Sequence, residues 1–438
     1  MSVSFTTLWG TRRVKSVASK IGSGKTPPGG SERYVDEGTI FLRSQNVHFD
    51  GLRLDDVAYI DEATHRDMHG TRVKPDDVLL NITGASLGRV TRAPRNLGEA
   101  NVNQHVCIVR PTKEVSARYL TYALASRPGQ EQIFELQVGG NREGLNFEQV
   151  GNLRLPAAPL EEQHRIANFL DAETNRIDRV GEAREAQGAL LSLMLGQLID
   201  GAIAGDAETL KKLGVDTDDA GWELGKVSRL CQVIPGYAFP SEGFLRSGGT
   251  SLLRGINVSV DATSWDDTVS WDEEKTPTPQ RFHLRNGDLV MGMDRPWISS
   301  GMRMTFISEN DLPALLLQRV ACLRPKSAEV DTGYIYWSLR SSRFRQAVEG
   351  ELTGVSVPHL SGDQIGGFTF PLPPLSTQRD ISERLSDHSA RIRGLRSSMN
   401  RQAELLAERR QALITAAVTG QFDVSTASGR NVTEGVSV

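Results

Sequence analysis

Residues 22–26 read Gly-Ser-Gly-Lys-Thr, a pattern whose residue types could bind phosphate. In a P-loop, backbone amides and a lysine of such a segment hold phosphates at the N-terminus of a helix. The complete motif needs a glycine where this chain has Ser19, and it needs a helix where residues 27–30 read Pro-Pro-Gly-Gly. The segment therefore argues against nucleotide hydrolysis.

Two other spacings match parts of metal-dependent motifs. His65 and His69 are four residues apart, but Arg66 stands where a His-Glu-x-x-His metallohydrolase has its glutamate. Glu273 and Lys275 form the Glu-x-Lys half of a nuclease motif, with no Pro-Asp pair suitably placed upstream. The chain also lacks an Asn-Pro-Pro-Tyr motif and a glycine-rich cofactor loop after a strand. We expect a surface pair of histidines, no catalytic residue and no metal ligand.

The composition is typical of a folded protein. The 438 residues are 38% hydrophobic and 24% charged, which predicts packed cores and about three domains. The net charge of -4 excludes a uniformly basic nucleic-acid-binding protein, so any such contact must be local. Cys107, Cys231 and Cys322 are too far apart for a zinc motif and fit a reducing compartment. No signal peptide is evident, and the apolar stretch 189–204 is short for a membrane span, so we expect a cytoplasmic protein.

One pattern occurs twice along the chain. Four segments of the first half match four segments of the second half, in the same order and at offsets of 211 to 215 residues. The pairs are Leu42–Val47 with Leu253–Val258, Asp77–Leu79 with Asp288–Val290, Gln104–Pro111 with Gln318–Pro325, and Leu155–Gln163 with Phe370–Gln378. Conserved order with small insertions indicates an internal duplication.

Each copy consists of a globular part followed by a long helical pattern. The globular parts are rich in Gly, Pro, Asn and short β-like runs, which predicts an α+β fold. Gly205 and Gly420 stand where a glycine commonly ends a helix. The predicted parts are a first globular domain (1–158), a first helix (159–205), a linker (206–225), a second globular domain (226–374), a second helix (375–420) and a C-terminal tail (421–438).

Both helical segments carry the same heptad pattern. Alternate steps of four and three find seven apolar residues at ten positions from Ile166 to Leu198, and seven at ten from Ile381 to Leu413. The segment 159–205 has a net charge of -4 and 375–420 has +3, so the two attract each other. A pseudo-two-fold relation predicts an antiparallel coiled coil of roughly 60 Å with the domains at opposite ends. A helix that packs only on its own domain also fits one such stripe.

Several motifs together resemble a known family. They are the duplication, the segment 371–378 (Pro-Leu-Pro-Pro-Leu-x-x-Gln) before a heptad helix, the loops 22–27 and 84–89, and the repeated Gln-x-Val-x-x-x-Arg-Pro strands. Over nearly its whole length, the chain resembles the specificity subunit of type I restriction-modification systems. The two proline-rich segments before the helices, 155–163 and 371–378, are the hinges of this pattern, and the first one departs from it by reading Leu-Pro-Ala-Ala-Pro-Leu at 155–160. The loop 291–297 departs from it as well. The resemblance implies two target-recognition domains that each read half of a split DNA sequence, with the helices setting the gap.

Reading a DNA sequence needs side chains that pair with base edges, such as Arg or Lys with guanine and Asn or Gln with adenine. Both domains supply such residues on predicted loops. The candidate DNA-binding residues are Lys25, Thr26, Arg43, Gln45, Asn46, Ser86, Arg89, Tyr237, Arg254, Asn257, Arg295 and Arg319. Each could instead be a solvated surface residue or a turn-capping residue. The loops 84–89 and 291–297 differ as loops with different specificity would, and ordinary drift explains them equally.

Neither globular domain has enough positive charge to bind phosphates tightly alone, since residues 12–158 carry +3 and residues 226–374 carry -1. The resemblance implies partners: two modification (methyltransferase) subunits docked on the domains and helices, and restriction subunits for translocation and cleavage. S-adenosylmethionine, ATP and Mg are then expected on those partner subunits and no cofactor on this chain. Two alternatives stay open, a coiled-coil scaffold that never reads DNA and an enzyme with an unrecognised nuclease or methyltransferase site.

Overall fold

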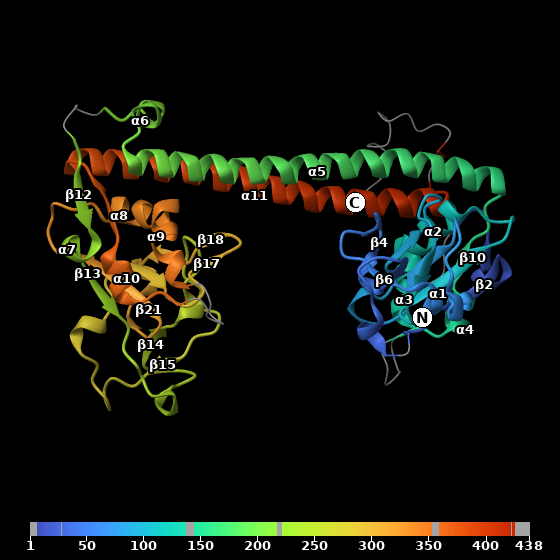
Figure 1. The fold of residues 1–438 in the computed structure, drawn as a ribbon, viewed down its shortest axis with the longest axis horizontal. Coiled ribbons are helices and arrows are strands. Elements are labelled where there is room, and N and C mark those ends of the chain that lie inside the picture. The colour runs from blue at the N-terminus through green and yellow to red at the C-terminus, as the bar shows by residue number, and fades with distance from the viewer. Residues whose placement is uncertain are drawn as a thin grey trace. The chain divides into compact units, whose positions relative to one another are not determined.

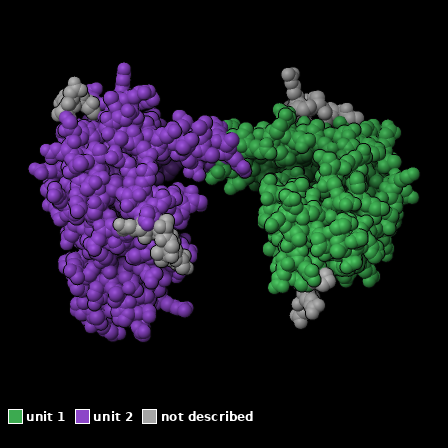
Figure 2. Space-filling model, in the orientation of Figure 1, with its two compact units in different colours: residues 1–184, 400–438 green, residues 185–399 purple. Residues whose placement is uncertain are grey.

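The computed structural model describes residues 7–27, 29–136, 144–216, 221–352, 359–421 and 423–424. The chain divides into two compact units, which we name unit 1 (residues 1–184 with 400–438) and unit 2 (residues 185–399; Figure 2). The C-terminal tail predicted over 421–438 lies mostly outside the described residues.

Unit 1 contains a four-stranded antiparallel sheet and a three-stranded mixed sheet (Figure 1). The large sheet consists, in order, of β2 (Ala18–Ser23), β10 (Val106–Pro111), β7 (Val78–Asn81) and β8 (Val90–Arg92). The small sheet is β6 (Ala58–Ile60), β3 (Thr39–Leu42) and β9 (Ala100–Val102), with β3 and β9 parallel. Two pairs complete the unit, β1 (Thr11–Arg13) with β11 (Arg154–Pro156) and β4 (Val47–His48) with β5 (Gly51–Leu52).

Unit 2 repeats this strand order. Its large sheet is β13 (Cys231–Pro235), β21 (Val320–Pro325), β16 (Leu289–Gly292) and β19 (Met304–Phe306). Its small sheet is β15 (Ser270–Trp271), β14 (Thr250–Leu253) and β20 (Ala314–Leu316), and β12 (Glu223–Lys226) pairs with β22 (Thr369–Leu372). A hairpin of β17 (Trp297–Ile298) and β18 (Gly301–Met302) begins at the end of the divergent loop 291–297. The shared topology confirms the internal duplication and the α+β fold.

Each unit also contains short helices. Those of unit 1 are α1 (Glu62–Asp67), α2 (Ala117–Ala125), α3 (Arg127–Glu135) and α4 (Phe147–Asn152). Those of unit 2 are α6 (Ala207–Leu213), α7 (Val227–Leu230), α8 (Thr332–Arg340), α9 (Ser342–Leu352) and α10 (Gly362–Gly367). Helix α6 falls within the segment 206–225, where we predicted only a linker, and the Asp206 side chain caps it by accepting from Thr209 N at 2.8 Å.

A buried ion pair recurs at the same place in both large sheets. In unit 1 the guanidinium of Arg110 donates to both carboxylate oxygens of Asp77, at 2.7 Å each. In unit 2 Arg324 donates to the two oxygens of Asp288 at 2.8 and 2.7 Å, and these bonds raise the pKa of Arg324. The arginine of the repeated Gln-x-Val-x-x-x-Arg-Pro strand therefore has a structural role, because a paired carboxylate satisfies it inside the protein.

The glutamine of each proline-rich hinge also has a structural role. Gln163 is 2% exposed, accepts from Ser116 N at 2.9 Å and donates to Ala158 O at 2.8 Å. Gln378 makes the equivalent bonds to Asp331 N and Pro373 O, both at 2.9 Å. Each hinge is thus joined to the residue that precedes α2 or α8, which fixes where the following long helix leaves its domain.

The two long helices are α5 (Leu160–Ala204) and α11 (Leu375–Thr419). In unit 1 the first half of α5 lies beside the last half of α11, and Arg410 pairs with Asp178 at 2.5 Å (Figure 1). In unit 2 the last half of α5 shares a core with the first half of α11, including Ile203 and Ile381. Each unit therefore holds opposite ends of the two helices, which confirms the antiparallel pairing.

The predicted heptad positions are correct near the helix ends and wrong in places between them. Ile166 and Leu385 are fully buried, as predicted, whereas Val180, Met194 and Leu395 are 41%, 53% and 51% exposed. An α-helix has 3.6 residues per turn, so a stripe of period 3.5 drifts around a long helix. The ends also pack on their own domains, which changes the face that is buried.

By length and hydropathy alone, α5 is able to cross a membrane, with 17% of its most apolar 18-residue window buried. Within unit 2, its residues Ile199, Ala202 and Ile203 belong to a hydrophobic core, and Asp200 accepts from Ser342 N at 2.7 Å. This packing accounts for part of the apolar face.

Burial corrects one expectation and explains the cysteines. His65, expected at the surface, is 2% exposed, and its Nδ1 lies 2.5 Å from Asn101 Oδ1, because α1 packs against β9. All three cysteines are free and buried, and burial raises the pKa of Cys107 to about 12 and that of Cys231 to about 11. Such protonated thiols are poor nucleophiles.

Candidate nucleic-acid interface

The candidate residues of unit 1 lie on loops that meet at one end of the two sheets. Gly24 N donates to Asn103 O, and Asn103 N donates to Leu42 O, both at 3.0 Å, so the ends of β2 and β3 adjoin the segment before β10. A Cβ on Gly24 would lie 1.6 Å from Val102 O, so only glycine permits this approach. The glycine of the Gly-Ser-Gly-Lys-Thr segment thus serves loop packing.

Two of the predicted residues, Asn46 and Asn257, are buried and bonded to loop backbone. Asn46 is 2% exposed, and its amide donates to Arg53 O and Asp56 O at 2.8 and 3.1 Å. Asn257 is 1% exposed and makes the equivalent bonds to the carbonyls of Ser264 and Asp267. Either asparagine would have to lose these backbone hydrogen bonds before its amide could pair with the edge of a DNA base.

Arg43 and Arg254 also stabilise their own loops. Arg43 Nη2 donates to Asp56 O at 3.2 Å, and Arg254 Nη2 donates to Asp267 O. In both side chains the Nε is buried without a hydrogen-bond partner. Each guanidinium is half-buried and stabilises the turn that follows its strand, β3 for Arg43 and β14 for Arg254.

Thr26, an exposed candidate of unit 1, belongs to a hydrogen-bonded chain that includes three residues outside the predicted set. Thr26 Oγ1 donates to Gln104 Oε1, the Gln104 amide lies 2.9 Å from His105 Nε2, and His105 Nδ1 lies 2.5 Å from Thr83 Oγ1. Beside this chain, Lys25 is exposed.

The remaining candidates of unit 1 lie on nearby loops. Gln45 is exposed and donates to Asp56 Oδ2 at 2.9 Å. Ser86 and Arg89 are half-buried on the β7–β8 loop, where Asn81 N donates to Arg89 O at 2.8 Å. The same loop is therefore joined to the last residue of β7.

In unit 2, three predicted arginines line one hollow of about 440 Å³. Its lining residues are Arg254, Gly255, Ile256, Asp294, Arg295, Arg303, Leu317, Gln318 and Arg319. Four arginines against one aspartate give this hollow a net positive charge, although the sequence 226–374 is slightly acidic. Burial lowers the pKa of Arg303, whose Nε and Nη1 donate to Val258 O and Asp294 O at 3.0 Å. The local charge favours a polyanion.

Tyr237 is close to this hollow through its backbone. Tyr237 N donates to Leu316 O, and Gln318 N donates to Tyr237 O, both at 2.9 Å. Its ring is 40% exposed and packs 4.9 Å from the ring of Phe239 and 5.1 Å from that of Phe282, centroid to centroid. An exposed, rigidly supported ring can stack on a base.

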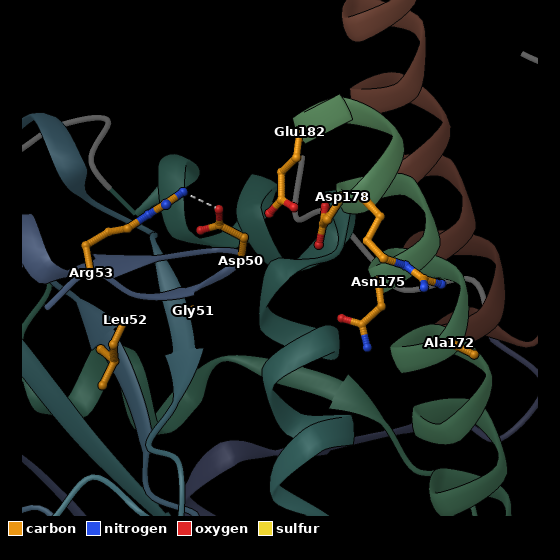
Figure 3. Close-up of a pocket in the computed structure, with 9 residues that line it drawn as sticks. Asp50, Gly51, Leu52, Arg53, Ala172, Asn175, Asp178 and Glu182 are labelled. Carbon is orange, nitrogen blue, oxygen red and sulfur yellow. Dashed lines mark hydrogen bonds and ion pairs between the residues drawn. The ribbon is translucent and has the colours of Figure 1, made fainter. Parts of the chain in front are cut away.

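A second hollow, of about 670 Å³, lies in unit 1 between the β4–β5 turn and α5 (Figure 3). Its charged lining residues are Asp50, Arg53, Asp178, Arg179 and Glu182, and none of the predicted DNA-binding residues borders it. A lining with more carboxylates than guanidiniums repels phosphate. This hollow lacks the surplus of guanidinium groups that lines the hollow of unit 2.

The structure thus distinguishes residues that the sequence treated alike. It also adds Gln104, His105, Asp294, Arg303 and His359 to the polar groups at these loops. The offsets between the two repeats could have shown which of these positions are equivalent in the two units. They could not have shown that the side chains at these positions contact one another. Whether each of the twelve predicted residues contacts DNA stays a prediction.

Comparison with known proteins places this geometry in a family. The family model described as the type I restriction modification DNA specificity domain matches residues 7–185 and again residues 220–402. The chain belongs to this family. The specificity subunit of the type I restriction enzyme MjaVIII from Methanocaldococcus jannaschii is 23% identical over 353 residues, which is 80% of each chain. The EcoAI specificity subunit from Escherichia coli is 34% identical over 168 residues, 38% of this chain and 28% of the relative.

Solved structures share the fold. A chain from a structure titled for the assembly and conformational transition of the type I R-M system has a TM-score of 0.70 and 18% identity, covering 94% of this chain and 98% of its own. The HsdS subunit from Thermoanaerobacter tengcongensis has a TM-score of 0.52 and 17% identity, covering 94% and 97%. The family match in each half agrees with the duplicated strand order.

Proposed function

We propose that each globular domain of this specificity subunit reads one half of a bipartite DNA sequence. The chain is a sequence-specific DNA-recognition subunit of a type I restriction-modification complex. One observation carries the two-site proposal: the loops at the same end of the same sheets bear different side chains in the two units. Arg319 and Asp294, which line the hollow of unit 2, stand where unit 1 has His105 and Thr83. Different side chains on one scaffold suit two different half-sites.

The DNA and the methyltransferase and restriction subunits are the partners of such a chain. We propose two modification subunits, one per repeat, that dock on the recognition domains and helices. On α5, Leu190, Leu193 and Met194 are 55%, 59% and 53% exposed, at the i, i+3, i+4 spacing of one helix face. Exposed apolar groups gathered on one face favour contact with another protein.

We propose that the chain itself is not catalytic, that it works in the cytoplasm, and that S-adenosylmethionine, ATP and Mg bind to the partner subunits. Support comes from the family match and from curated relatives that are specificity subunits of type I restriction enzymes. The purified chain should neither methylate nor cleave DNA, and either activity in a homogeneous preparation would favour the enzyme alternative.

A genome-wide methylation map tests the main proposal. Cells that carry this chain with its modification subunit should show a split methylated motif that disappears when only this chain is deleted. As a matched pair, Arg295→Ala should alter one half of the motif and Lys25→Ala only the other. An unchanged map, with both proteins expressed and assembled, would contradict the proposal and favour the scaffold alternative.

A further inference from the structure

Three backbone positions at the open end of the large sheet are equivalent in the two units. In unit 2 they are Asp294, Arg319 and His359: Met293 N donates to Arg319 O, and Leu360 N donates to Met293 O, both at 2.9 Å. Asp294 also forms a β-bridge with His359. These contacts tie the end of β16, the residue before β21 and the segment before α10 into one small framework.

The same framework occurs in unit 1 at Thr83, His105 and Gly144. There Ile82 N donates to His105 O at 2.9 Å, Leu145 N donates to Ile82 O at 2.8 Å, and Thr83 bridges Gly144. The equivalence therefore rests on backbone hydrogen bonds as well as on sequence offsets. What differs between the units is the side chains.

In unit 2 the framework carries a charged cluster. Asp294 accepts from Arg319 Nη1 with Oδ2 and lies against His359 Nδ1 with Oδ1, each at 2.6 Å. The side chain of Asp294 is 23% exposed, whereas that of Arg319 is 64% exposed. Burial alone would raise the pKa of Asp294, but the hydrogen bonds from His359 and Arg319 hold it below its ordinary value. The mostly buried carboxylate of Asp294 thus holds the exposed guanidinium of Arg319.

In unit 1 the same positions carry a hydroxyl group, an imidazole ring and, at the third, no side chain. Thr83 Oγ1 pairs with His105 Nδ1 at 2.5 Å, and Gly144 has nothing to offer. The side chains described at these three positions of unit 1 include no guanidinium, so the two frameworks present different hydrogen-bonding groups at the same place in the fold.

The surroundings of Arg319 are costly for a purely structural ion pair. Arg295 and Arg319 have φ values of 44° and 68°, which non-glycine residues rarely adopt, and both line the arginine-rich hollow. Strain of this kind persists where the surrounding structure enforces it, often at binding sites. Arg254 and Arg303 in the same hollow add like charge near Arg319. A DNA phosphate would relieve that repulsion, because it is negatively charged.

We propose that Asp294 is a positioning residue that holds Arg319 to read a guanine in the half-site of the second domain. With Nη1 bonded to Asp294, the guanidinium keeps further N–H donors for the O6 and N7 acceptors of guanine. Fixing a long side chain before binding reduces the ordering cost of the contact. The first domain, with His105 at the equivalent place, reads its half-site without this contact. The inference rests on the proposed function and adds a base and two residue roles to it.

The test uses the intact complex of this chain with its modification subunits and a library of duplexes with both half-sites randomised. Selection and sequencing give the base preference at every position. Arg319→Gln should lower the preference for guanine at one position of the second half-site roughly 10- to 100-fold. Asp294→Asn should lower it at that same position by a smaller factor, because the arginine remains but is no longer held.

Two controls make the result specific. Arg343, which is exposed on α9, lies outside the lining of the hollow, so Arg343→Ala removes one positive charge from the same domain and should leave every base preference unchanged. Thr83→Ala changes the equivalent position of unit 1 and should leave the second half-site unchanged. An unaltered first half-site in the Asp294 and Arg319 variants shows that their complexes are folded and assembled.

The outcomes separate this inference from the function on which it rests. Specific binding by the wild type, with guanine preference intact in both Arg319→Gln and Asp294→Asn, would overturn the inference and leave the function standing. No sequence preference in the assembled wild type would overturn the proposed function, and this inference with it.

Discussion

Replacing Asp288 by asparagine removes the charge that neutralises Arg324 inside the large sheet of unit 2. The two side chains are 5% and 12% exposed and share two hydrogen bonds of 2.8 and 2.7 Å. Asparagine keeps the shape but places an NH2 group or a neutral oxygen against the guanidinium. Breaking a buried, hydrogen-bonded ion pair by removing one partner costs about 3–5 kcal/mol, because the other charge stays buried. We expect Asp288→Asn to destabilise unit 2 by about that amount.

Hydrogen exchange followed by mass spectrometry is the suitable assay. The chain has two compact units, so a single unfolding midpoint would mix their responses. A loss of about 3–5 kcal/mol should speed exchange in β16 and β21 by roughly two to three and a half orders of magnitude, while β7 and β10 of unit 1 keep their protection. Asp77→Asn, the equivalent change in unit 1, should give the opposite pattern.

A matched control is Glu208→Gln, which breaks an exposed ion pair with Lys212 on α6. It should leave exchange in both large sheets unchanged, since exposed pairs contribute little. If exchange in β16 and β21 of Asp288→Asn stays within about threefold of the wild type, the reasoning from the buried pair is refuted.

Two more predictions concern stability. The Asp311 carboxylate accepts from a backbone amide, two hydroxyl groups and an indole N–H; burial alone would raise its pKa, but these bonds hold the pKa below its ordinary value of 3.8. The free energy of unfolding that the Asp311 carboxylate contributes is therefore fully present above about pH 4 and is lost as the pH falls through the lower folded pKa. In denaturant titrations, Asp311→Asn should lower the free energy of unfolding by about 1 kcal/mol at pH 7 and by progressively less below pH 4. A difference between the variant and the wild type that does not change with pH would contradict this. Gly24→Ala should displace the loop after β2 and weaken binding to the first half-site, because its Cβ would lie 1.6 Å from Val102 O. Gly98→Asn, at an open turn with φ 80°, is the control and should leave binding unchanged. Equal binding by Gly24→Ala and the wild type would show that the close contact between Gly24 and Val102 is not needed for binding.

Much of the architecture follows from local patterns in the sequence. The duplicated motifs predicted two α+β domains, and the heptads predicted two antiparallel helices, because periodicity and repetition are properties of neighbouring residues. The middle of the heptad stripe was wrong at Val180, Met194 and Leu395, since the face a long helix buries depends on what lies against it.

The roles of individual polar residues were decided by tertiary structure. The sequence does not distinguish the arginines at positions 110, 254 and 319. In the structure, Arg110 is paired with Asp77 in a sheet, Arg254 holds a turn, and Arg319 is 64% exposed at the hollow of unit 2. A hydrogen bond between residues 25 or 65 positions apart, such as those that join Arg319 and His359 to Asp294, leaves no periodic trace in the chain. The sequence alone determined that two similar domains are joined by two helices. Only the fold decided which charged groups are paired inside a domain and which are exposed at its loops, because that depends on contacts between distant segments.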